Sequence, residues 1–137
     1  MKIVICGSMS ASKQILKIKK FFEEKGHEVV IPRNADKYAS GEVQAEGGNE
    51  STKNKIDYDL IRDYYLKIKE SDVVLIANYD KGDVRNYIGG NSFLEAGFAY
   101  VLNKKLYFLN DIPDMVYSDE LRAFQPVILN GDLSKIV

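Results

Sequence analysis

One charged residue stands inside an otherwise apolar segment near the middle of the chain. The segment is 89–99, GGNSFLEAGFA, and its acid is Glu95. Asn91 or Ser92 is a good helix N-cap, so the pattern predicts a helix that runs to about Asn103. Free N–H groups and the helix dipole favour anions at a helix start, and an ionised carboxylate can serve as a nucleophile. Glu95 is therefore a candidate catalytic residue.

A purely structural role for Glu95 is the alternative. With Ser92 as the cap, SFLE matches the capping box Ser-x-x-Glu, in which the glutamate binds the backbone N–H of the cap residue. Two features favour chemistry instead. The predicted helix is apolar nearly all round, which places it centrally or at a subunit interface, and the preceding loop, YDKGDVRNYIGG, is longer than a strand-to-helix turn requires.

The first loop, GSMSAS, offers a second group of polar atoms. Gly7 permits close approach of a backbone, and Ser8, Ser10 and Ser12 present hydroxyls at a helix start. The loop resembles a phosphate cradle but matches neither Gly-x-x-x-x-Gly-Lys-Ser/Thr nor Gly-x-Gly-x-x-Gly. A serine-capped helix without a ligand is the alternative interpretation.

Strands and helices alternate along the chain and position these residues. Short apolar runs predict strands, and amphipathic patterns predict helices. The predicted strands are Lys2–Cys6, 27–32, 72–78, 105–110 and 126–130, and the predicted helices are 10–26, 56–71, 92–103 and 118–124. The predicted strands are apolar throughout and do not alternate between apolar and polar residues. This pattern indicates a sheet that is covered on both faces. We expect one α/β domain over 1–137, a three-layer sandwich with a mostly parallel five-stranded sheet of flavodoxin-like or Rossmann-like type.

The segment 33–55 departs from this alternation. It holds three glycines and mixed charges but scarcely any large apolar residue, and loops of this length are usually lids or disordered. We expect either a flexible insertion or a lid over the site, because the segment leaves the sheet at the carboxyl end of the second strand.

Composition narrows the class of protein. The 137 residues are 45% hydrophobic and carry a net charge of −1, without a basic tract for a nucleic-acid backbone. The N-terminal apolar run is too short for a signal peptide or a membrane span. One cysteine, Cys6, predicts a reducing cytoplasm, and one histidine with no ligand-like spacing predicts no metal site and no cofactor.

The motifs together resemble the nucleoside 2-deoxyribosyltransferase superfamily, which includes 2′-deoxynucleoside 5′-phosphate N-hydrolases. The resemblance rests on CGS closing the first strand, SDVVLIAN in the third, and GGNSFLEAGFA followed by LNKKLYFLN. Residues 95–99, EAGFA, match the Glu-Leu-Gly-x-Ala of that superfamily with one change. The order of elements matches over most of the chain.

This resemblance implies a reaction and a set of site residues. Glu95 would attack C1′ of a 2-deoxyribose and displace the base, and water or a second base would then resolve the glycosyl ester. Asp63 would hold the sugar or assist the base, with Asp59 and Asp57 as alternatives. The predicted substrate- and phosphate-binding residues are Gly7, Ser8, Ser10, Gly90, Asn91 and Ser92. The ligand would be a small-molecule nucleotide or nucleoside.

The sequence departs from the superfamily at three points. The aromatic hydroxyl expected on the first strand is replaced by Val4, and Tyr79 or Tyr87 could supply one instead. The first loop lacks an arginine, so Lys13 or Arg85 would have to bind a phosphate. The Gly-Thr before the glutamate is Asn91-Ser92.

Two other functions compete with catalysis. The chain could be a non-catalytic nucleotide-binding module in which Glu95 is a cap, or the segment 87–103 could mainly form a subunit interface. The helix at 56–71 is rich in tyrosine and apolar on more than one face, which also suggests a homo-oligomer.

Overall fold

Five strands form one sheet in a computed structural model that describes residues 1–41, 53, 55–56 and 59–136. In the sheet the strands lie in the order β2-β1-β3-β4-β5, and each neighbouring pair is parallel. They are β1 (Lys2–Cys6), β2 (Glu28–Val30), β3 (Val73–Ile76), β4 (Lys105–Phe108) and β5 (Val127–Ile128). The strand order is that of flavodoxin-like sheets.

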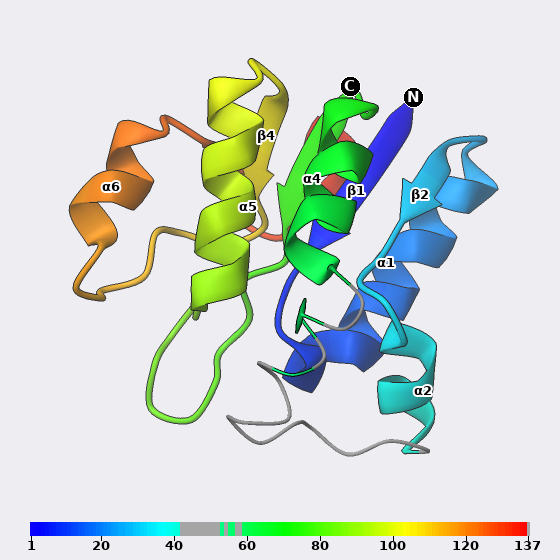
Figure 1. Ribbon diagram of the computed structural model, residues 1–137, viewed down its shortest axis with the longest axis horizontal. Coiled ribbons are helices and arrows are strands. Elements are labelled where there is room, and N and C mark those ends of the chain that lie inside the picture. Colours follow the sequence, from blue (N-terminus) through cyan, green and yellow to red (C-terminus); the bar gives the residue numbers. More distant parts are fainter. Residues whose placement is uncertain (42–52, 54, 57–58, 137) are drawn as a thin grey trace.

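Helices cover both faces of this sheet, as Figure 1 shows. Helix α1 (Ser12–Glu24) packs on one face, and α4 (Leu60–Lys69) and α5 (Gly90–Val101) pack on the other. A short helix, α6 (Ser118–Ala123), lies beside α5. The predicted three-layer α/β sandwich is therefore confirmed.

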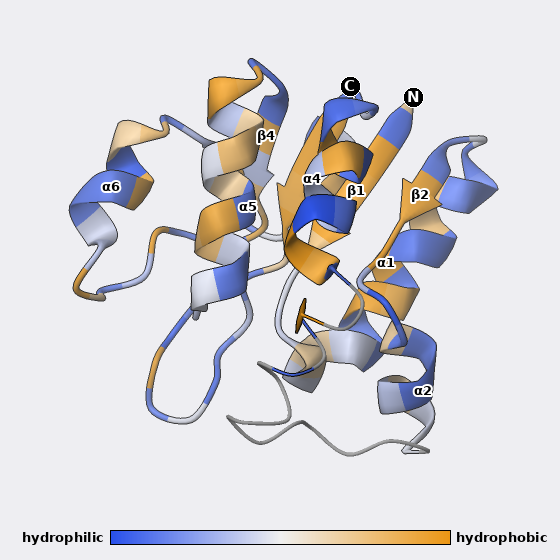
Figure 2. Ribbon diagram, viewed as in Figure 1, coloured by the Kyte–Doolittle hydropathy of each residue, from blue (hydrophilic) through white to orange (hydrophobic). Residues whose placement is uncertain are grey.

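The alternation of side chains along β1 divides the core in two. Ile3 and Ile5 pack towards α1, whereas Val4 and Cys6 pack towards α4 and α5. Figure 2 shows the apolar strands between helices whose outer surfaces are hydrophilic. Since both faces of the strands are buried, the strands read as continuous apolar runs in the sequence.

Three helix starts differ from the prediction. Helix α4 begins at Leu60 rather than at residue 56. A single 3-10 turn, η1 (Met9–Ala11), precedes α1, so the α-helix begins at Ser12 rather than at residue 10. Helix α5 begins at Gly90, and its N-cap is Gly89 rather than Asn91 or Ser92. Ser92 is 4% exposed and lies inside the first turn, where the buried environment outweighs its preference for a cap.

The segment 33–55 contains a helix that the sequence did not predict. Helix α2 (Ala35–Ser40) directly follows β2, and Ala35 at its start is fully buried. Within the predicted lid, residues 42–52 and 54 lie outside the described residues. The chain ends its described part with a second 3-10 turn, η2 (Leu133–Lys135).

The strand order reverses between β1 and β3, which fixes the place of a ligand site. From β1 the chain moves outward to β2, and it then returns to β3 on the other side of β1. The loops that leave the carboxyl ends of β1 and β3 therefore diverge and leave a crevice between them. In Figure 1 both loops and α2 lie at the same end of the sheet.

Candidate functional site

A cavity of about 520 Å³ opens at this end of the sheet. Its lining comes from the first loop, the loop after β2, helix α2, Lys55, helix α4, the loop after β3 and the first two turns of α5. The structure brings all eight predicted site residues to this one cavity: Gly7, Ser8, Ser10, Asp63, Gly90, Asn91, Ser92 and Glu95. Residues far apart in the sequence meet there because parallel strands end at the same edge.

Glu95 does not form the capping box. It is in the second turn of α5, where the N-cap is Gly89 and no side chain caps the helix. The Phe93 N–H donates to the Gly89 carbonyl oxygen at 2.9 Å, so the first helical bond is an ordinary backbone bond. Among the described residues, none donates a hydrogen bond to the Glu95 carboxyl, which lines the cavity instead. The structural alternative for this residue is wrong.

Burial controls the charge of the Glu95 carboxyl. Surrounding protein atoms remove it from water and raise its pKa from 4.5 to about 8, although part of the side chain remains open to the cavity. The expectation that the helix start keeps it ionised is wrong, because the dipole effect fades beyond the first turn. At neutral pH the group is mainly a neutral acid, and it becomes a nucleophile once it loses its proton.

Two buried groups lie close enough to Glu95 for their charges to interact. The Cys6 thiol, from β1, has a pKa raised well above its usual range by burial and then by Glu95. Burial likewise raises the pKa of the Tyr64 hydroxyl, from α4, with further contributions from Cys6, Glu95 and Asp63. The Tyr64 hydroxyl donates a hydrogen bond to the Ile5 carbonyl oxygen.

Tyr64 places an aromatic hydroxyl near the acid, and it was not predicted from the sequence for this role. Val4 is fully buried in the core, as its place on the first strand requires. Of the two tyrosines suggested instead, Tyr87 lines the cavity, whereas Tyr79 packs against the core on the α1 side of the sheet. Only the packing of α4 on the sheet could reveal Tyr64.

Asp63 is the aspartate of α4 that lines the cavity. Its carboxylate forms an ion pair with Lys67 at 3.0 Å, one turn further along the helix. Asp59 instead pairs with Arg62 at 2.6 Å and does not line the cavity, and Asp57 lies outside the described residues. Asp63 can accept hydrogen bonds from a ligand hydroxyl beside the Glu95 carboxyl.

The first loop passes tightly against the end of β3. A Cβ on Gly7 would lie 3.0 Å from Cδ1 of Ile15 and 3.2 Å from the carbonyl oxygen of Ala77. The Ser8 hydroxyl accepts from the Ser10 N–H at 3.3 Å, which caps η1, and the two hydroxyl oxygens are 2.9 Å apart. These serines therefore cap a helical turn and line the cavity at the same time.

Among the described residues, three cations line the cavity, and none of them was predicted from the sequence as a site residue. They are Arg33, Lys55 and Lys81. The Lys81 Nζ lies 3.4 Å from the Ser8 Oγ and 5.0 Å from the centre of the Tyr87 ring. Neither Lys13 nor Arg85, the two cations proposed from the sequence, is in the lining. The sequence offered no local signal for Lys81, because its loop meets the first loop only in the folded chain.

The start of α5 leaves space on the cavity side. A Cβ built on Gly90 would have no neighbouring atom within 4 Å. The N–H groups of a first helical turn lack intrahelical partners and can donate to a ligand. Gly90 thus lets a ligand approach the helix backbone closely.

The described side chains do not form a cluster of metal ligands. Within 1–41, 53, 55–56 and 59–136, no three His, Cys, Asp or Glu side chains are grouped so that they could hold an ion. Over the same residues, no helix has the length and apolar character to cross a membrane.

Comparison with known proteins gives no relative: no protein family, curated protein or solved structure matches this chain.

Proposed function

We propose that this protein cleaves the N-glycosidic bond of a 2′-deoxynucleotide or 2′-deoxynucleoside, as a hydrolase or a base-exchange transferase. Glu95 is the nucleophile. The observation that carries the proposal is a desolvated carboxyl, free of hydrogen bonds from the described residues, at the wall of a ligand-sized cavity. Perturbed acids in cavities are characteristic of functional sites. The motif resemblance in 89–99 supports the same reaction.

The reaction proceeds in two displacements. The ionised Glu95 oxygen forms a bond to C1′ while the C1′–N bond breaks, and the electron pair of that bond leaves with the base. The base takes up a proton from water or a site acid. Water or a second base then attacks C1′ of the glycosyl ester, its proton is released, and Glu95 is regenerated as a carboxylate.

The neighbouring groups favour this chemistry at the acid. Asp63 accepts a hydrogen bond from a sugar hydroxyl and so orients C1′ towards Glu95. The apolar surroundings that raise the Glu95 pKa also leave its carboxylate poorly solvated, and a poorly solvated anion is a strong nucleophile.

A screen for released base tests this proposal. Deoxynucleosides, ribonucleosides and their 5′-monophosphates are each incubated with the protein, and free base is measured by chromatography. We expect release from deoxy substrates, a rate that rises with pH through about 8, and at least a thousandfold loss in Glu95→Gln.

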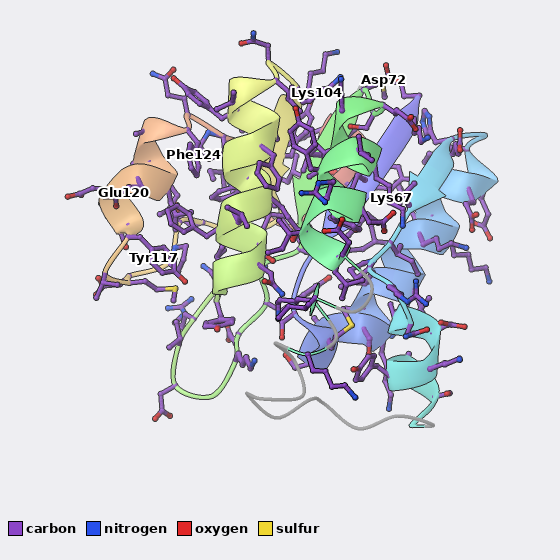
Figure 3. All side chains as sticks on the ribbon, viewed as in Figure 1. Lys67, Asp72, Lys104, Tyr117, Glu120 and Phe124 are labelled. Atoms are coloured by element: carbon purple, nitrogen blue, oxygen red, sulfur yellow. The ribbon has the colours of Figure 1, made fainter. Side chains whose placement is uncertain are left out.

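Glu120→Gln is the matched control, because Glu120 lies on α6 and points away from α5 (Figure 3). It makes the same chemical change and should leave the rate of base release unaltered. Base release by a folded Glu95→Gln protein at the wild-type rate would contradict the proposal.

A non-catalytic nucleotide-binding module is the second candidate function. The protonated state of Glu95 at neutral pH favours it, because a neutral carboxyl binds hydroxyls and ring nitrogens without attacking them. This candidate predicts measurable nucleotide binding by calorimetry and no base release from any substrate at pH 8.5.

We also propose that copies of the chain associate in a cytoplasmic homo-oligomer. Large apolar side chains on α4 and α5 are exposed, among them Ile61, Leu66, Leu94 and Val101. Exposed apolar groups that lie together commonly mark protein interfaces. The one cysteine, Cys6, is a buried free thiol and is compatible with a reducing compartment.

A further inference from the structure

Lys67 contacts two consecutive residues of α4 that belong to the candidate site. Its ammonium lies 3.0 Å from the Oδ2 atom of Asp63 and 5.8 Å from the centre of the Tyr64 ring. Asp63 and Tyr64 both line the cavity, whereas Lys67 does not. Figure 3 shows Lys67 on α4. Any effect of Lys67 on a bound ligand must therefore pass through these two side chains.

The geometry of the helix explains how Lys67 reaches Asp63. Residues four apart lie on one face of an α-helix, and their side chains lean towards the helix N-terminus. The part of α4 that lines the cavity ends at Tyr64, so the lysine stem approaches the site from one turn further along the helix. Lys67 thus binds the carboxylate without occupying the cavity.

The Asp63 carboxylate has a second oxygen that the ion pair does not use. Lys67 binds at Oδ2, and within the described part of the chain Oδ1 has no hydrogen-bond or ion-pair partner. Each carboxylate oxygen can accept hydrogen bonds, so Oδ1 stays available to a ligand hydroxyl. An aspartate that rotated freely would lose that freedom on binding, and the loss would weaken affinity. The ion pair removes part of this cost in advance.

A second ion pair of the same kind lies far from the site and separates this role from stability. Lys19 and Glu23 on α1 are also four residues apart, at 3.1 Å, with exposed fractions of 33% and 47%. For Lys67 and Asp63 the fractions are 36% and 44%. Water screens both pairs, so each contributes little to folding. Only Asp63 lines the cavity.

We infer that Lys67 is a positioning residue of the candidate site. Its ammonium fixes one oxygen of the Asp63 carboxylate and so presents the other oxygen to a hydroxyl of the ligand sugar. Lys67 acts through Asp63 and touches no ligand. That the ligand carries a sugar rests on the function proposed above, and the role of Lys67 is therefore tested by binding as well as by base release.

Binding measurements on matched variants test this role. Lys67→Met removes the ammonium and keeps an apolar stem, and Lys19→Met makes the same change in the pair on α1. Calorimetry with Glu95→Gln as the starting protein measures the affinity for a 2′-deoxynucleoside without turnover. We expect Lys67→Met to weaken binding about tenfold and Lys19→Met to leave it unchanged. The midpoint of thermal unfolding should shift equally little in both.

A double-mutant cycle shows whether Lys67 acts through Asp63. Asp63→Asn keeps the shape of the side chain and removes the charge that the ammonium binds. Lys67→Met should therefore cause little further loss of affinity in a protein that already carries Asp63→Asn. Lys67→Arg keeps the positive charge and should retain most of the affinity. In the protein with Glu95 intact, Lys67→Met should lower kcat/KM for base release by a similar factor.

Three results would overturn the inference. They are an affinity of Lys67→Met equal to that of the starting protein, an equal loss in Lys19→Met, and a full additional loss when Lys67→Met is combined with Asp63→Asn. Failure of the proposed reaction has a different signature, because Lys67-dependent binding would then persist in a protein that releases no base.

Discussion

At the scale of single residues, Glu95 combines a cost in stability with a capacity for chemistry. Its carboxyl is near enough to the buried groups Cys6 and Tyr64 to raise their pKa values, and it receives no hydrogen bond from the described residues. A buried acid without a partner stays protonated until the pH is well above its ordinary pKa. Residues that destabilise the fold in this way are commonly retained for function.

Replacement of Glu95 by glutamine should change how stability depends on pH. The folded-state pKa is about 8 and the ordinary value is 4.5, so the folded protein holds the proton more tightly than the unfolded chain does. Wild-type stability should therefore fall as the pH rises from about 5 to 9, by roughly 3–5 kcal/mol. Glu95→Gln lacks this group and should not show that part of the decrease.

Urea denaturation at pH 5, 7 and 9 measures the effect as the difference in unfolding free energy between the two proteins. The groups that interact with the acid, Cys6 and Tyr64, are present in both, and Glu120→Gln serves as the surface control. Parallel curves for wild type and Glu95→Gln would show that the carboxyl is well solvated, against the structure.

At the scale of elements, the absence of a side chain has a different effect at each of two glycines that line the cavity. Gly7 is surrounded closely by Ile15 and Ala77, because the first loop passes against the end of β3. Gly90 has open space where a side chain would begin, on the first turn of α5. The first glycine allows the fold, whereas the second leaves room for a ligand.

Alanine substitution separates these two roles. Gly7→Ala should destabilise the protein by about 1–3 kcal/mol, because a methyl group 3.2 Å from a backbone oxygen forces the loop to move. Gly90→Ala should keep or raise stability by up to about 1 kcal/mol, since alanine favours the helix. The Gly90 variant should bind nucleoside monophosphate about tenfold more weakly.

Thermal unfolding measures the stability of each variant, and calorimetry measures ligand affinity. Each glycine variant is the control for the other. Equal stability losses in both would contradict the packing described for Gly7, and unchanged affinity in Gly90→Ala would place the ligand elsewhere in the cavity.

At the scale of the whole molecule, α4, α5 and α6 leave an apolar groove of about 290 Å³ on the surface. It is lined by Tyr65, Phe93, Leu94, Gly97, Phe98, Val101, Leu102 and Phe124. Phe124 and Tyr117 lie between α6 and α5 in Figure 3, where both rings contact Phe93. Leu94 and Phe98 also line the ligand cavity, so the groove and the cavity share a wall.

A charge placed in this groove should separate the copies of the proposed oligomer. Val101 is 76% exposed and lines the groove, and Val101→Glu would bury a carboxylate in an apolar contact. We expect the variant to sediment as a monomer at concentrations where the wild type is oligomeric.

Val116→Glu is the matched control for sedimentation, because Val116 is 99% exposed and lies outside the groove. It should leave the oligomeric state of the wild type unchanged. A wild-type protein that sediments as a monomer, or an unaltered oligomer in Val101→Glu, would contradict association through this face.

Local patterns were sufficient to predict the architecture and eight of the residues that line the cavity. Short apolar runs predicted all five strands, and their alternation with helices predicted the α/β sandwich with its site at the strand ends. The parallel sheet then brought Gly7, Asp63 and Glu95 to one cavity. These features depend on residue patterns within single helices and strands, and such patterns are present in the sequence before the chain packs.

The tertiary structure alone decided the chemical state of the site. Helix α5 begins at Gly90, earlier than the sequence predicted, so Glu95 lies beyond the capping position. Its carboxyl is desolvated there. Tyr64 and Lys81 line the cavity because α4 and the loop after β3 pack beside the first loop. Desolvation and proximity between distant segments depend on the packed chain as a whole, so residue types and spacing within one element do not encode them.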